Sequence, residues 1–545
     1  VATLINAAKP PLIDDPAYYA VGRQIAKAPL DPYGFEQFWY NQPEPANHIL
    51  GPPVFLYWLG LGIRLVGDDP VRLKFWLYPV VALFSSAWFA LLRRLARPAA
   101  MPVLWLTLLS PVLIPNLNFM LDVPAAALAL TSLVVFLRAL ERNQILFALV
   151  AGIVAGLAAQ TKYTGGLSWP IFVLAALLVR TSQSPGRWRR LLLAGVALLG
   201  AGIVFTGWEI YLWQKYDESH FLFHFRDSSS GWLHKARLAP SLLLLLGAML
   251  PPAAAAALMG LRWQRGFTVF CGAMLFGYAA ILLIPGTSRS AWADKVDQQR
   301  IDVAGAVFAV LGVAAGAITI FTAVRFFARR DAKNRWRATW PGMFLAAWLA
   351  LEIAGYFALT PFPATRRVLG IVLIGTLIAA RMLSFGMRRS GHGLRWLAII
   401  PGCAIGLLYN ALNVRESYLQ PEAVRTAVHE IRAREPNARI WFVGHWGFQF
   451  EAERLGLMPV VPNRSRLEAG DWLVWPDHTL VNQQEIEAEP PLGLPVADWD
   501  FRLPLPLRTI PPYYGGALGL ERWPHPHMAV RIYRVEQSWT PPAAK

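Results

Sequence analysis

Three basic side chains, an adjacent pair of arginines and a lysine far from them in the sequence, have the chemistry to bind an anion. Arg366 and Arg367 form a pair in PFPATRRVLG, and Lys162 lies in AAQTKYTGG. Guanidinium groups bind phosphate with two parallel hydrogen bonds, and a lysine supplies a point charge. The competing interpretations are an arginine pair that anchors the chain among lipid headgroups and a lysine that extends toward the membrane interface. If the three cations instead bind a ligand, it is expected to be a phosphate at a membrane surface.

Three acids form the second chemical group in the sequence. Asp14 and Asp15 follow PPLI and open a helical pattern, and Asp122 opens the apolar stretch DVPAAALAL. An acid beside a proline in the first turn of a helix is a good N-terminal cap. Capping would explain Asp122 and one acid of the pair, more readily Asp15. It leaves the other acid unexplained, and an acid at the membrane face is costly enough to indicate a function.

The histidines carry weaker signals. His48 precedes the apolar segment GPPVFLYWL, and a lone histidine is more often structural than functional. His220 and His224 have the i,i+4 spacing that can bind a metal, but the sequence offers no further ligand beside them. His445 follows a predicted strand and could line a pocket. The sequence contains no Walker loop, nucleophile elbow or GxGxxG motif, so a cytosolic nucleotide-driven reaction has no visible apparatus.

The composition is that of a membrane protein. Hydrophobic residues make up 55% of the 545-residue chain and charged residues 16%, and the mean hydropathy is +0.38, too apolar for a soluble enzyme. The net charge of +17 comes from basic residues beside apolar segments, so we expect no nucleic-acid binding. Cys271 and Cys403 lie inside apolar runs and are expected to be core residues rather than a disulfide.

About twelve apolar stretches approach the length of about 20 residues that a spanning helix needs. They cover 71–92, 100–118, 123–140, 145–160, 165–180, 190–213, 238–260, 266–285, 303–327, 339–360, 365–384 and 394–412. The stretch 52–67 is shorter, begins with two prolines and carries Arg64, so we expect it to lie in the membrane interface. Residues 1–8 look like the tail of a preceding helix, which would bring the count to thirteen.

Clusters of arginine predict the orientation of these spans, because basic loops stay on the cytoplasmic side. The six clusters lie within 93–97, 138–142, 187–190, 262–265, 325–337 and 381–395. The opposite face then holds residues 1–70, the turn at Asp122, 161–166, 360–366 and everything after about 413. All three acids and all three candidate cations therefore fall on the extracytoplasmic side of a plasma (inner) membrane.

The composition changes after Asn413. The following residues predict an amphipathic helix, a strand at 439–443, a second helix, and strands near 471–475 and 530–535. The predicted fold is a polytopic α-helical membrane protein with a C-terminal soluble α/β domain. Its three parts are a first external loop with interfacial helices and the acidic pair (1–70), a transmembrane domain (71–413) and an extracytoplasmic α/β domain (414–545).

Five motifs, taken together, resemble a known family. They are DDPAYY with Tyr18 and Tyr19, HILGPPVFLYWL with His48, LDVPAAALAL, GLAAQTKYTG with Tyr163, and TRRVLG. Their order, spacing and common side are similar to polyprenyl-phosphate-sugar-dependent glycosyltransferases of the C-type membrane fold, in particular the protein O-mannosyltransferase and lipid A aminoarabinose transferase group. The resemblance covers about residues 1–385. The chain departs from the family in carrying Asp-Asp for Asp-Glu and in separating His48 from the two prolines.

The resemblance implies an inverting glycosyltransferase that moves a sugar from a polyprenyl-phosphate donor to a hydroxyl of a protein, lipid or glycan acceptor. Asp14 or Asp15 would be the general base, and Asp122 would orient it or the acceptor. The lipid phosphate would be held by Arg366, Arg367 and Lys162. The other binding residues would be Tyr18, Tyr19, Tyr163 and His48. No cofactor is predicted to be required and no metal ligand is assigned. Two acids near a phosphate could hold a divalent metal ion, but none is expected because the arginines make it unnecessary.

Two other functional classes stay open. A transporter or flippase would use the same acids and arginines to bind a lipid-linked substrate without chemistry. The predicted spans carry few charges at mid-membrane depth, where transport sites lie, and the exceptions are Glu209 and Glu352. The other class is an inactive scaffold whose α/β domain binds a partner in the cell envelope.

Overall fold

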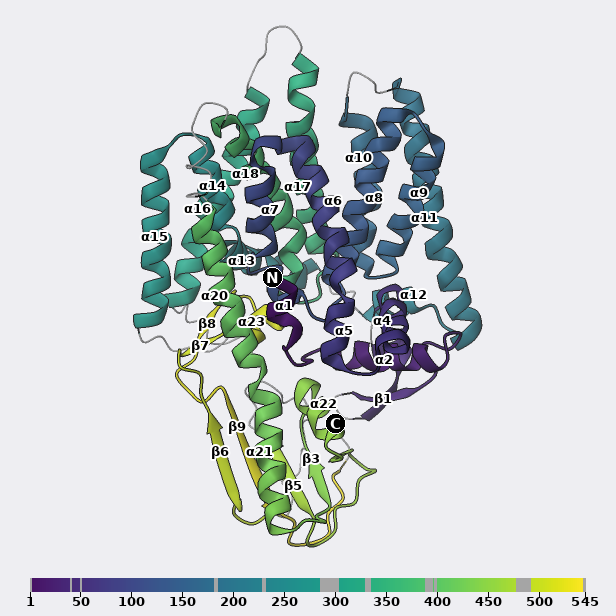
Figure 1. Ribbon diagram of the computed structural model, residues 1–545, viewed down its shortest axis with the longest axis vertical. Helices are drawn as coiled ribbons and strands as arrows, with labels where there is room; N and C mark the ends of the chain where they lie inside the picture. Colours follow the sequence, from purple (N-terminus) through teal and green to yellow (C-terminus); the bar gives the residue numbers. More distant parts are fainter. Residues whose placement is uncertain are drawn as a thin grey trace.

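The chain folds into a large helical bundle with a smaller α/β region at one end (Figure 1). In the computed structural model, the described residues are 2–39, 42–49, 51–180, 185–227, 232–284, 303–328, 335–387, 396, 399–476 and 492–542. Parts of the last two arginine clusters, at 325–337 and 381–395, lie outside these residues.

The apolar stretches of the sequence form the helices of the bundle. These are α6 (Tyr78–Ala96), α7 (Ala100–Leu108), α8 (Asp122–Arg142), α9 (Ile145–Ala159), α10 (Ser168–Leu178), α11 (Arg187–Tyr216), α13 (Trp232–Met249), α14 (Pro251–Gly260), α15 (Gln264–Leu283), α16 (Val303–Ala328), α17 (Arg335–Leu359), α18 (Leu369–Met387) and α20 (Ile400–Ser417). Four short 3-10 turns accompany them, η1 (Arg97–Ala99), η2 (Ile114–Asn116), η3 (Tyr163–Leu167) and η4 (Thr365–Val368).

Fewer of these helices have spanning length than the sequence predicted. Among the described residues, seven are long and apolar enough to cross a membrane, or eight if the bent pair α13 and α14 is one span. The predicted spans 145–160 and 165–180 are the shorter helices α9 and α10, of 15 and 11 residues. The predicted spans 71–92 and 100–118 join into one stretch, Pro70–Leu108. Length and composition therefore support a multi-pass membrane protein, with fewer than twelve helices of spanning length among the described residues.

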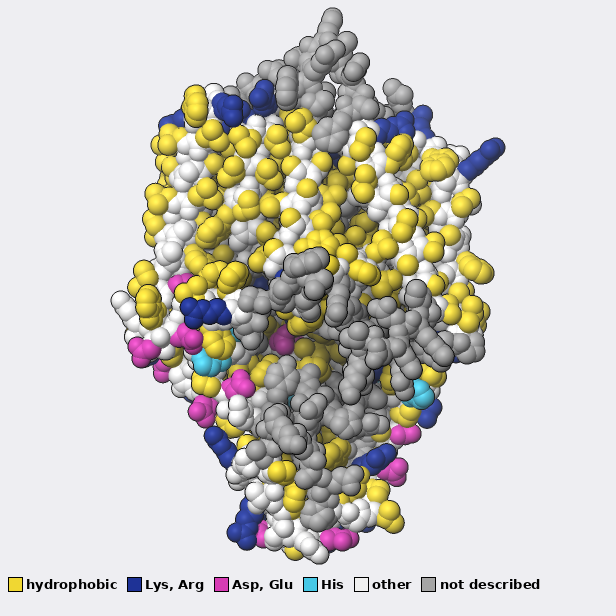
Figure 2. Space-filling model, turned by 180° about the vertical axis from the view of Figure 1, so that it is seen from behind, with side chains coloured by type: hydrophobic (Ala, Val, Ile, Leu, Met, Phe, Trp, Pro, Cys, Tyr) yellow, Lys and Arg dark blue, Asp and Glu magenta, His cyan; other side chains and the backbone are white. Residues whose placement is uncertain are grey.

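The charged side chains lie at the ends of the bundle. Figure 2 shows a broad hydrophobic band, with lysine and arginine along the edge farthest from the α/β region and with acids and histidines on the α/β side of the band. A side-chain distribution of this kind is expected for a bundle that crosses a lipid bilayer, because charges are costly within the hydrocarbon region.

Small residues allow the short helix α9 to pack closely on the long helix α11. A Cβ atom at Gly152 would lie 2.1 Å from the carbonyl oxygen of Ala197, and one at Gly156 would lie 2.7 Å from the Cβ of Val204. Glycines four residues apart let two helix backbones approach in a membrane, where apolar burial alone does not drive helices together. The close packing of α9 fixes the position of Lys162, three residues beyond its end.

The first seventy residues form short elements below the bundle. They are α1 (Ala2–Ala7), α2 (Asp15–Lys27), β1 (Glu36–Trp39), β2 (Gln42–Pro45), α3 (Ala46–Ile49), α4 (Val54–Val66) and the start of α5 (Pro70–Trp76), and α12 (His220–Asp227) lies beside them. Helix α2 runs across the end of the bundle (Figure 1) and packs against α4. Helix α4 is the segment expected in the membrane interface, and its 13 residues are too few to span a bilayer.

The C-terminal region contains a five-stranded mixed sheet in the order β4-β3-β5-β9-β6. Its elements are α21 (Leu419–Arg434), β3 (Ile440–Phe442), α22 (Trp446–Arg454), β4 (Met458–Pro459), β5 (Trp472–Pro476), β6 (Ala497–Phe501) and β9 (Met528–Arg534). Strand β3 is parallel to β4 and β5, whereas β9 is antiparallel to β5, with Leu473 opposite Tyr533. Helix α21 turns Val424, Ala427 and Ile431 toward the sheet, following its 3.6-residue period.

Part of the C-terminal region belongs to the core of the bundle. Between β6 and β9 the chain forms β7 (Leu507–Arg508), α23 (Ile510–Gly515) and β8 (Glu521–Arg522). Ile510, Tyr513 and Tyr514 are buried in the same hydrophobic cluster as the membrane helices. Helix α20 also continues through the expected boundary at 413 to Ser417. The residues 414–545 therefore combine a peripheral sheet with a segment that reaches into the bundle.

Candidate active site

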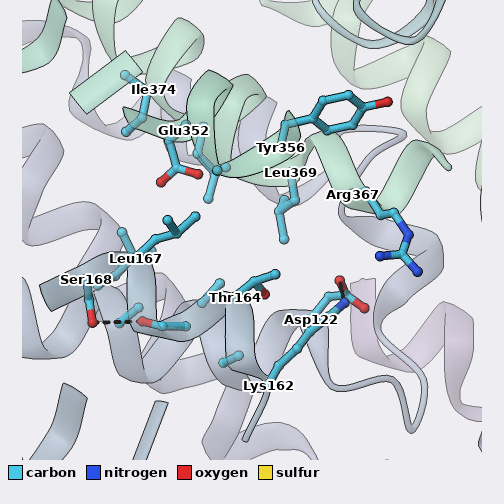
Figure 3. A pocket seen from close by; sticks show the side chains of 18 of the residues that line it. Asp122, Lys162, Thr164, Leu167, Ser168, Glu352, Tyr356, Arg367, Leu369 and Ile374 are labelled. Carbon is cyan, nitrogen blue, oxygen red and sulfur yellow. Dashed lines mark hydrogen bonds and ion pairs between the residues drawn. The ribbon is translucent and has the colours of Figure 1, made fainter. Parts of the chain in front are cut away.

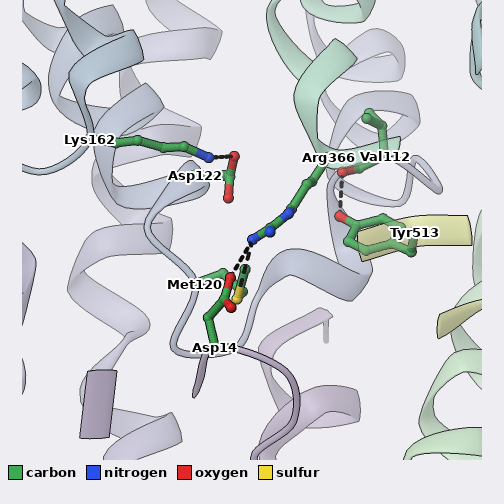
Figure 4. Close-up of polar contacts among 7 residues, drawn as sticks. All are labelled: Asp14, Val112, Met120, Asp122, Lys162, Arg366 and Tyr513. Atoms are coloured by element: carbon green, nitrogen blue, oxygen red, sulfur yellow. Dashed lines mark hydrogen bonds and ion pairs between the residues drawn. The ribbon is translucent and has the colours of Figure 1, made fainter. Parts of the chain in front are cut away.

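Four junctions between loops and helices meet where the bundle faces the α/β region (Figure 4). Asp14 directly precedes α2, Asp122 is the first residue of α8, and Lys162 directly precedes η3. Arg366 and Arg367 lie in η4, at the start of α18. The structure therefore brings together charged residues that are as much as 352 positions apart in the sequence.

Arg366 and Asp14 form an ion pair at the centre of this cluster. The Arg366 Nη1 atom lies 3.0 Å from Asp14 Oδ2, and the two side chains are 8% and 19% exposed. The same nitrogen lies 4.0 Å from the sulfur of Met120. Because the pair is mostly removed from water, its ionic contact matters more than one on an open surface. The small exposed part of Asp14 leaves its carboxylate within reach of a substrate.

Lys162 and Asp122 form a second ion pair beside the first. The Lys162 Nζ atom contacts Asp122 Oδ1, and the Asp122 side chain is almost fully buried. Burial lowers the pKa of Lys162 to about 8, with Arg366 and Arg367 adding to the effect and Asp122 opposing it. The three cations are therefore close enough to repel one another, which is the arrangement expected of a site that accepts an anion.

A cavity of about 130 Å³ opens beside the two ion pairs and runs between α8, α10, α17 and α18. Figure 3 shows Lys162, Asp122 and Arg367 at one end of it, with aliphatic side chains such as Leu369 along its wall. The ion pairs of the described residues use Lys162 and Arg366 but not Arg367. The Arg367 guanidinium lies 4.2 Å from the centre of the Phe362 ring. Arg367 is thus a cation held at the polar end of an apolar cavity.

Tyr356 and Glu352 are two polar residues of the cavity that were not selected from the sequence as parts of this site. Tyr356 lines the cavity, and its buried hydroxyl has no hydrogen-bond partner among the described residues. Glu352 lies toward the other end (Figure 3) and accepts a hydrogen bond of 3.0 Å from Trp348 Nε1. A tyrosine inside an apolar stretch gives no signal in the sequence, whereas Glu352 was noticeable as an acid inside a predicted span.

The structure separates the roles of the two neighbouring acids. Asp15 is fully buried and accepts hydrogen bonds from the Leu12 backbone N–H, at 3.1 Å, and from the Asn118 side chain. Burial raises the pKa of Asp15 to about 6. Its carboxylate thus fixes the loop before α2. The alternative considered from the sequence was that Asp15 caps the first turn of the helix.

An unusual backbone angle precedes the acids. Ile13 has a φ of +52°, in the left-handed region that is strained for a β-branched residue, at a cost of about 1–2 kcal/mol. Asp14 occupies the N-cap position of α2, yet its side chain makes no capping hydrogen bond. The turn at Ile13 therefore leaves Asp14 free for Arg366. Strain at such a position is typical of functional sites.

The two tyrosines after the acids point to different places. Tyr18 lies one helical turn after Asp14. Its buried phenol is close enough to Asp14, Arg366 and Asp122 to interact electrostatically with all three charges. Tyr19 instead donates a hydrogen bond of 2.6 Å to Asp68 and packs on Phe119. Tyr18 thus belongs to the candidate site, whereas the contacts of Tyr19 tie α2 to the loop before α5.

Tyr163 and His48 also make their contacts elsewhere. The Tyr163 hydroxyl lies 2.6 Å from His220 Nδ1, and His48 Nε2 lies 2.9 Å from Glu218. His48 also stacks on Phe223 in α12. Both side chains hold the loop after α11 in place, so the structure does not bring them to the ion pairs. Their positions in the sequence suggested that they lie near the site, but their side chains point toward other partners.

The other three candidate histidines make contacts within the protein. His220 and His224 lie one turn apart in α12 with ring centres 4.4 Å apart. Within the described residues, no group of three or more histidine, cysteine, aspartate or glutamate side chains is arranged to hold a metal ion. His445 lies before α22 and contacts Gln449 at 2.6 Å and the ring of Trp39. It links the C-terminal region to β1 beside the acidic pair.

Comparison with solved structures finds matches of low sequence identity to oligosaccharyltransferases. The archaeal oligosaccharyltransferase AglB from Archaeoglobus fulgidus, in complex with an inhibitory peptide and a dolichol-phosphate, is 15% identical with a TM-score of 0.48, and the match covers 84% of this chain and 63% of that chain. The Archaeoglobus fulgidus oligosaccharyltransferase tethered with an acceptor peptide is 14% identical with a TM-score of 0.41, over 84% and 63%. The chain thus spans 63% of the length of both. The comparison with curated proteins finds no match.

A family comparison is more informative for the segment that carries Asp122 and Lys162. Residues 51–209 match the family model described as dolichyl-phosphate-mannose-protein mannosyltransferase. This segment includes α4, α8 and α9, and it ends within α11. For this segment, the match confirms the predicted resemblance to the protein O-mannosyltransferase group.

Proposed function

We propose that the protein is an inverting glycosyltransferase that takes a sugar from a polyprenyl-phosphate donor at the extracytoplasmic face of the membrane. The observation that carries this proposal is the position of Arg366. It pairs with an accessible acid, Asp14, and also lines the apolar cavity. One guanidinium can therefore contact a lipid phosphate on one side and the acid that acts on the acceptor on the other.

The donor would bind with its lipid in the cavity and its phosphate at the polar end. Arg367 has no acid partner among the described ion pairs, so a phosphate would supply the missing charge. Lys162 and Arg366 would complete the site while keeping contact with their own acids. The cavity of about 130 Å³ accommodates only the first part of a polyprenyl chain, and the remainder would extend into the bilayer.

The reaction would be a single displacement. The acceptor oxygen attacks the anomeric carbon while the bond from that carbon to the phosphate oxygen breaks. The electron pair of the broken bond stays on the phosphate, where the cations stabilise it. Asp14 takes the proton of the acceptor hydroxyl. No acid is needed to protonate the leaving group, because a phosphate anion leaves well.

Binding of the donor would also prepare Asp14 for its role. In the described structure, the Asp14 carboxylate is held in an ion pair with Arg366 at 3.0 Å. A phosphate beside Arg366 would draw the guanidinium toward the cavity and weaken that ion pair. The Asp14 carboxylate would then be free to accept a hydrogen bond from the acceptor hydroxyl when a donor is present. Asp122 stays paired with Lys162, so its proposed role is to position that cation.

A carrier of a lipid-linked substrate is the second candidate, and Glu352 favours it. This acid lines the cavity within a candidate span, and ionisable groups at such depth often mark transport paths. A carrier would need Glu352 for movement of its substrate and would perform no chemistry with Asp14. The two candidates therefore depend on different acids.

The test is transfer from a panel of radiolabelled polyprenyl-phosphate sugars into membranes by purified protein in proteoliposomes. We expect incorporation by the wild type and by Asp68→Asn, the matched control at an exposed acid that pairs with Arg23. Asp14→Asn should incorporate none above background. The opposite outcome would be that a lipid-linked substrate moves across the vesicle membrane without any sugar transfer and that Glu352→Gln abolishes this movement. That outcome would favour the carrier over the glycosyltransferase.

A further inference from the structure

Helix α23 brings a tyrosine from the C-terminal region to the centre of the candidate site. Tyr514 lies with its ring 5.5 Å from the guanidinium carbon of Arg366. It is 4% exposed, and its hydroxyl has no hydrogen-bond partner among the described residues. A buried hydroxyl without a partner costs about 1–3 kcal/mol, so such groups are rare unless they serve a ligand.

The position of α23 is fixed by hydrogen bonds to three parts of the bundle. Tyr513 donates to the Val112 carbonyl at 2.8 Å, and Thr365 beside Arg366 donates to the Pro512 carbonyl at 3.3 Å. The carboxylate of Glu416 accepts three hydrogen bonds from the residues that begin α23. Figure 4 shows Tyr513 close to Arg366 with its bond to Val112. Tyr514 is thus held rigidly, although its own hydroxyl takes no part in the attachment.

The surroundings of Tyr514 indicate what its hydroxyl would bind. Its ring contacts Arg366, and its phenol feels the charges of Asp14, Asp15 and Asp122. Burial and these acids raise the pKa of Tyr514, so the hydroxyl keeps its proton and can both donate and accept. A sugar hydroxyl has the same double capacity. A carboxylate or phosphate would only accept hydrogen bonds, and the neighbouring cations already supply donors for such a group.

The arrangement around Arg366 also separates the phosphate from the sugar. Arg366, Arg367 and Lys162 line the cavity, whereas Tyr514 and Asp14 do not. A donor with its lipid in the cavity would place its phosphate at the cavity end and its sugar beyond, where Asp14 must act near the anomeric carbon. Tyr514 contacts the same guanidinium as Asp14, so a sugar held beside Asp14 would also come close to Tyr514.

We propose that the Tyr514 hydroxyl binds a hydroxyl group of the transferred sugar, so that the C-terminal region supplies part of the sugar-binding site. This inference rests on the proposed function. It makes α23 a positioning element for the donor and gives the C-terminal region a direct part in substrate recognition.

The experiment compares the binding of two lipids to full-length protein in nanodiscs. The probes are polyprenyl phosphate and the polyprenyl-phosphate sugars of the same chain length, with mannose first. Tyr514→Phe should weaken binding of the sugar-bearing lipid by about fivefold, the value of one net hydrogen bond. It should leave the affinity for the bare lipid phosphate unchanged. Its melting temperature should not fall, because the substitution breaks no protein hydrogen bond among the described residues.

Tyr513→Phe is the matched control. It removes the neighbouring hydroxyl, which bonds to Val112, so it should lower the melting temperature and leave the ratio of the two affinities unchanged. Equal effects of Tyr514→Phe on both lipids, or no effect on either, would overturn the sugar contact. An effect confined to the Michaelis constant of the acceptor would also overturn it.

The outcomes distinguish this inference from the proposed function. A wild type that binds neither lipid refutes both. If Arg367→Ala weakens both lipids while Tyr514→Phe changes neither, the phosphate site stands and the sugar contact falls. If Tyr514→Phe weakens only the sugar-bearing lipid but the wild type transfers no sugar, the contact stands and the catalytic proposal falls.

Discussion

Replacing Asp14 and Asp15 one at a time by asparagine separates chemistry from structure within the acidic pair. Asp14 contacts Arg366 and is partly exposed, whereas Asp15 is fully buried and holds Leu12 and Asn118. Loss of a general base lowers the rate by about 10²–10⁴-fold, equivalent to roughly 3–5 kcal/mol in the activation barrier. We therefore expect the turnover of Asp14→Asn to fall by at least 100-fold.

The same substitution at Asp15 should affect stability rather than turnover. An asparagine there keeps one side-chain oxygen to accept from the Leu12 N–H, and it removes a buried charge whose pKa is already raised to about 6. We expect a loss of about 1 kcal/mol in the free energy of unfolding, and turnover within about threefold of the wild type. Asp15→Ala leaves the Leu12 N–H and the Asn118 amide without this acceptor and should cost about 2–4 kcal/mol.

The assay measures initial transfer rates in proteoliposomes, normalised to folded protein by size-exclusion chromatography and thermal unfolding. Asp14→Asn also leaves Arg366 without its partner, which could lower stability by itself. The double variant Asp14→Asn with Arg366→Gln restores the charge balance, so it should regain stability but not turnover. Near-normal transfer by folded Asp14→Asn would refute the reasoning, and so would an Asp15→Asn variant that is stable but inactive.

Three further predictions follow from charge, burial and packing. Arg367→Ala should raise the Michaelis constant for the donor about tenfold with little change in kcat. The control Arg325→Ala, at an exposed position at the end of α16, should change neither constant. An unchanged Michaelis constant for the donor in Arg367→Ala would show that Arg367 does not bind the phosphate. Burial lowers the pKa of His445 from 6.5 to about 4. As the pH falls, the unfolded chain therefore binds a proton at a higher pH than the folded chain does. The free energy of unfolding should decrease by up to about 3 kcal/mol as pH falls from about 7 to 4. Measured by denaturant unfolding, this free energy should depend less on pH in His445→Gln than in the wild type. Gly152→Ala places a methyl group 2.1 Å from the Ala197 carbonyl and should lower stability by about 1–3 kcal/mol, and an unchanged melting temperature would show that α9 and α11 can move apart.

The sequence predicted the charged residues of the candidate site because charges are rare in a membrane protein. Asp122, Lys162, Arg366 and Arg367 each begin or precede an apolar stretch, and the alternation of basic loops put them on one side. The structure lines a single cavity with these four side chains. Their common side could be anticipated from topology alone, whereas their meeting in one site was implied by the family resemblance.

Side-chain direction could not be predicted in the same way. Asp14 and Asp15 are adjacent and identical in type, and their different roles depend on the left-handed turn at Ile13. No composition or spacing rule places a strained φ at an isoleucine. Tyr18 and Tyr19 differ for a similar reason, because neighbouring residues of a helix point about 100° apart.

The C-terminal region was the least predictable part, because its contacts are long-range. The strands predicted at 439–443, 471–475 and 530–535 are present as β3, β5 and β9, since alternating apolar residues mark a sheet locally. The packing of IPPYYG against η4 depends on a meeting of residues roughly 150 positions apart in the sequence, such as Thr365 and Pro512. Prolines and glycines are typical of loops, so this segment carries no sequence signal for a helix that enters the bundle.

Arg366 connects the acid, the cavity and the C-terminal region, and this has a consequence for how the site would work. Its guanidinium contacts Asp14 and the ring of Tyr514 and also lines the cavity. A phosphate that draws Arg366 toward the cavity would loosen its hold on Asp14 and shift its contact with the Tyr514 ring at the same time. Asp14 would then lose its ion pair with Arg366 only when the donor is in place. Transfer would therefore depend on a correctly bound donor, because only then could the Asp14 carboxylate contact the acceptor hydroxyl.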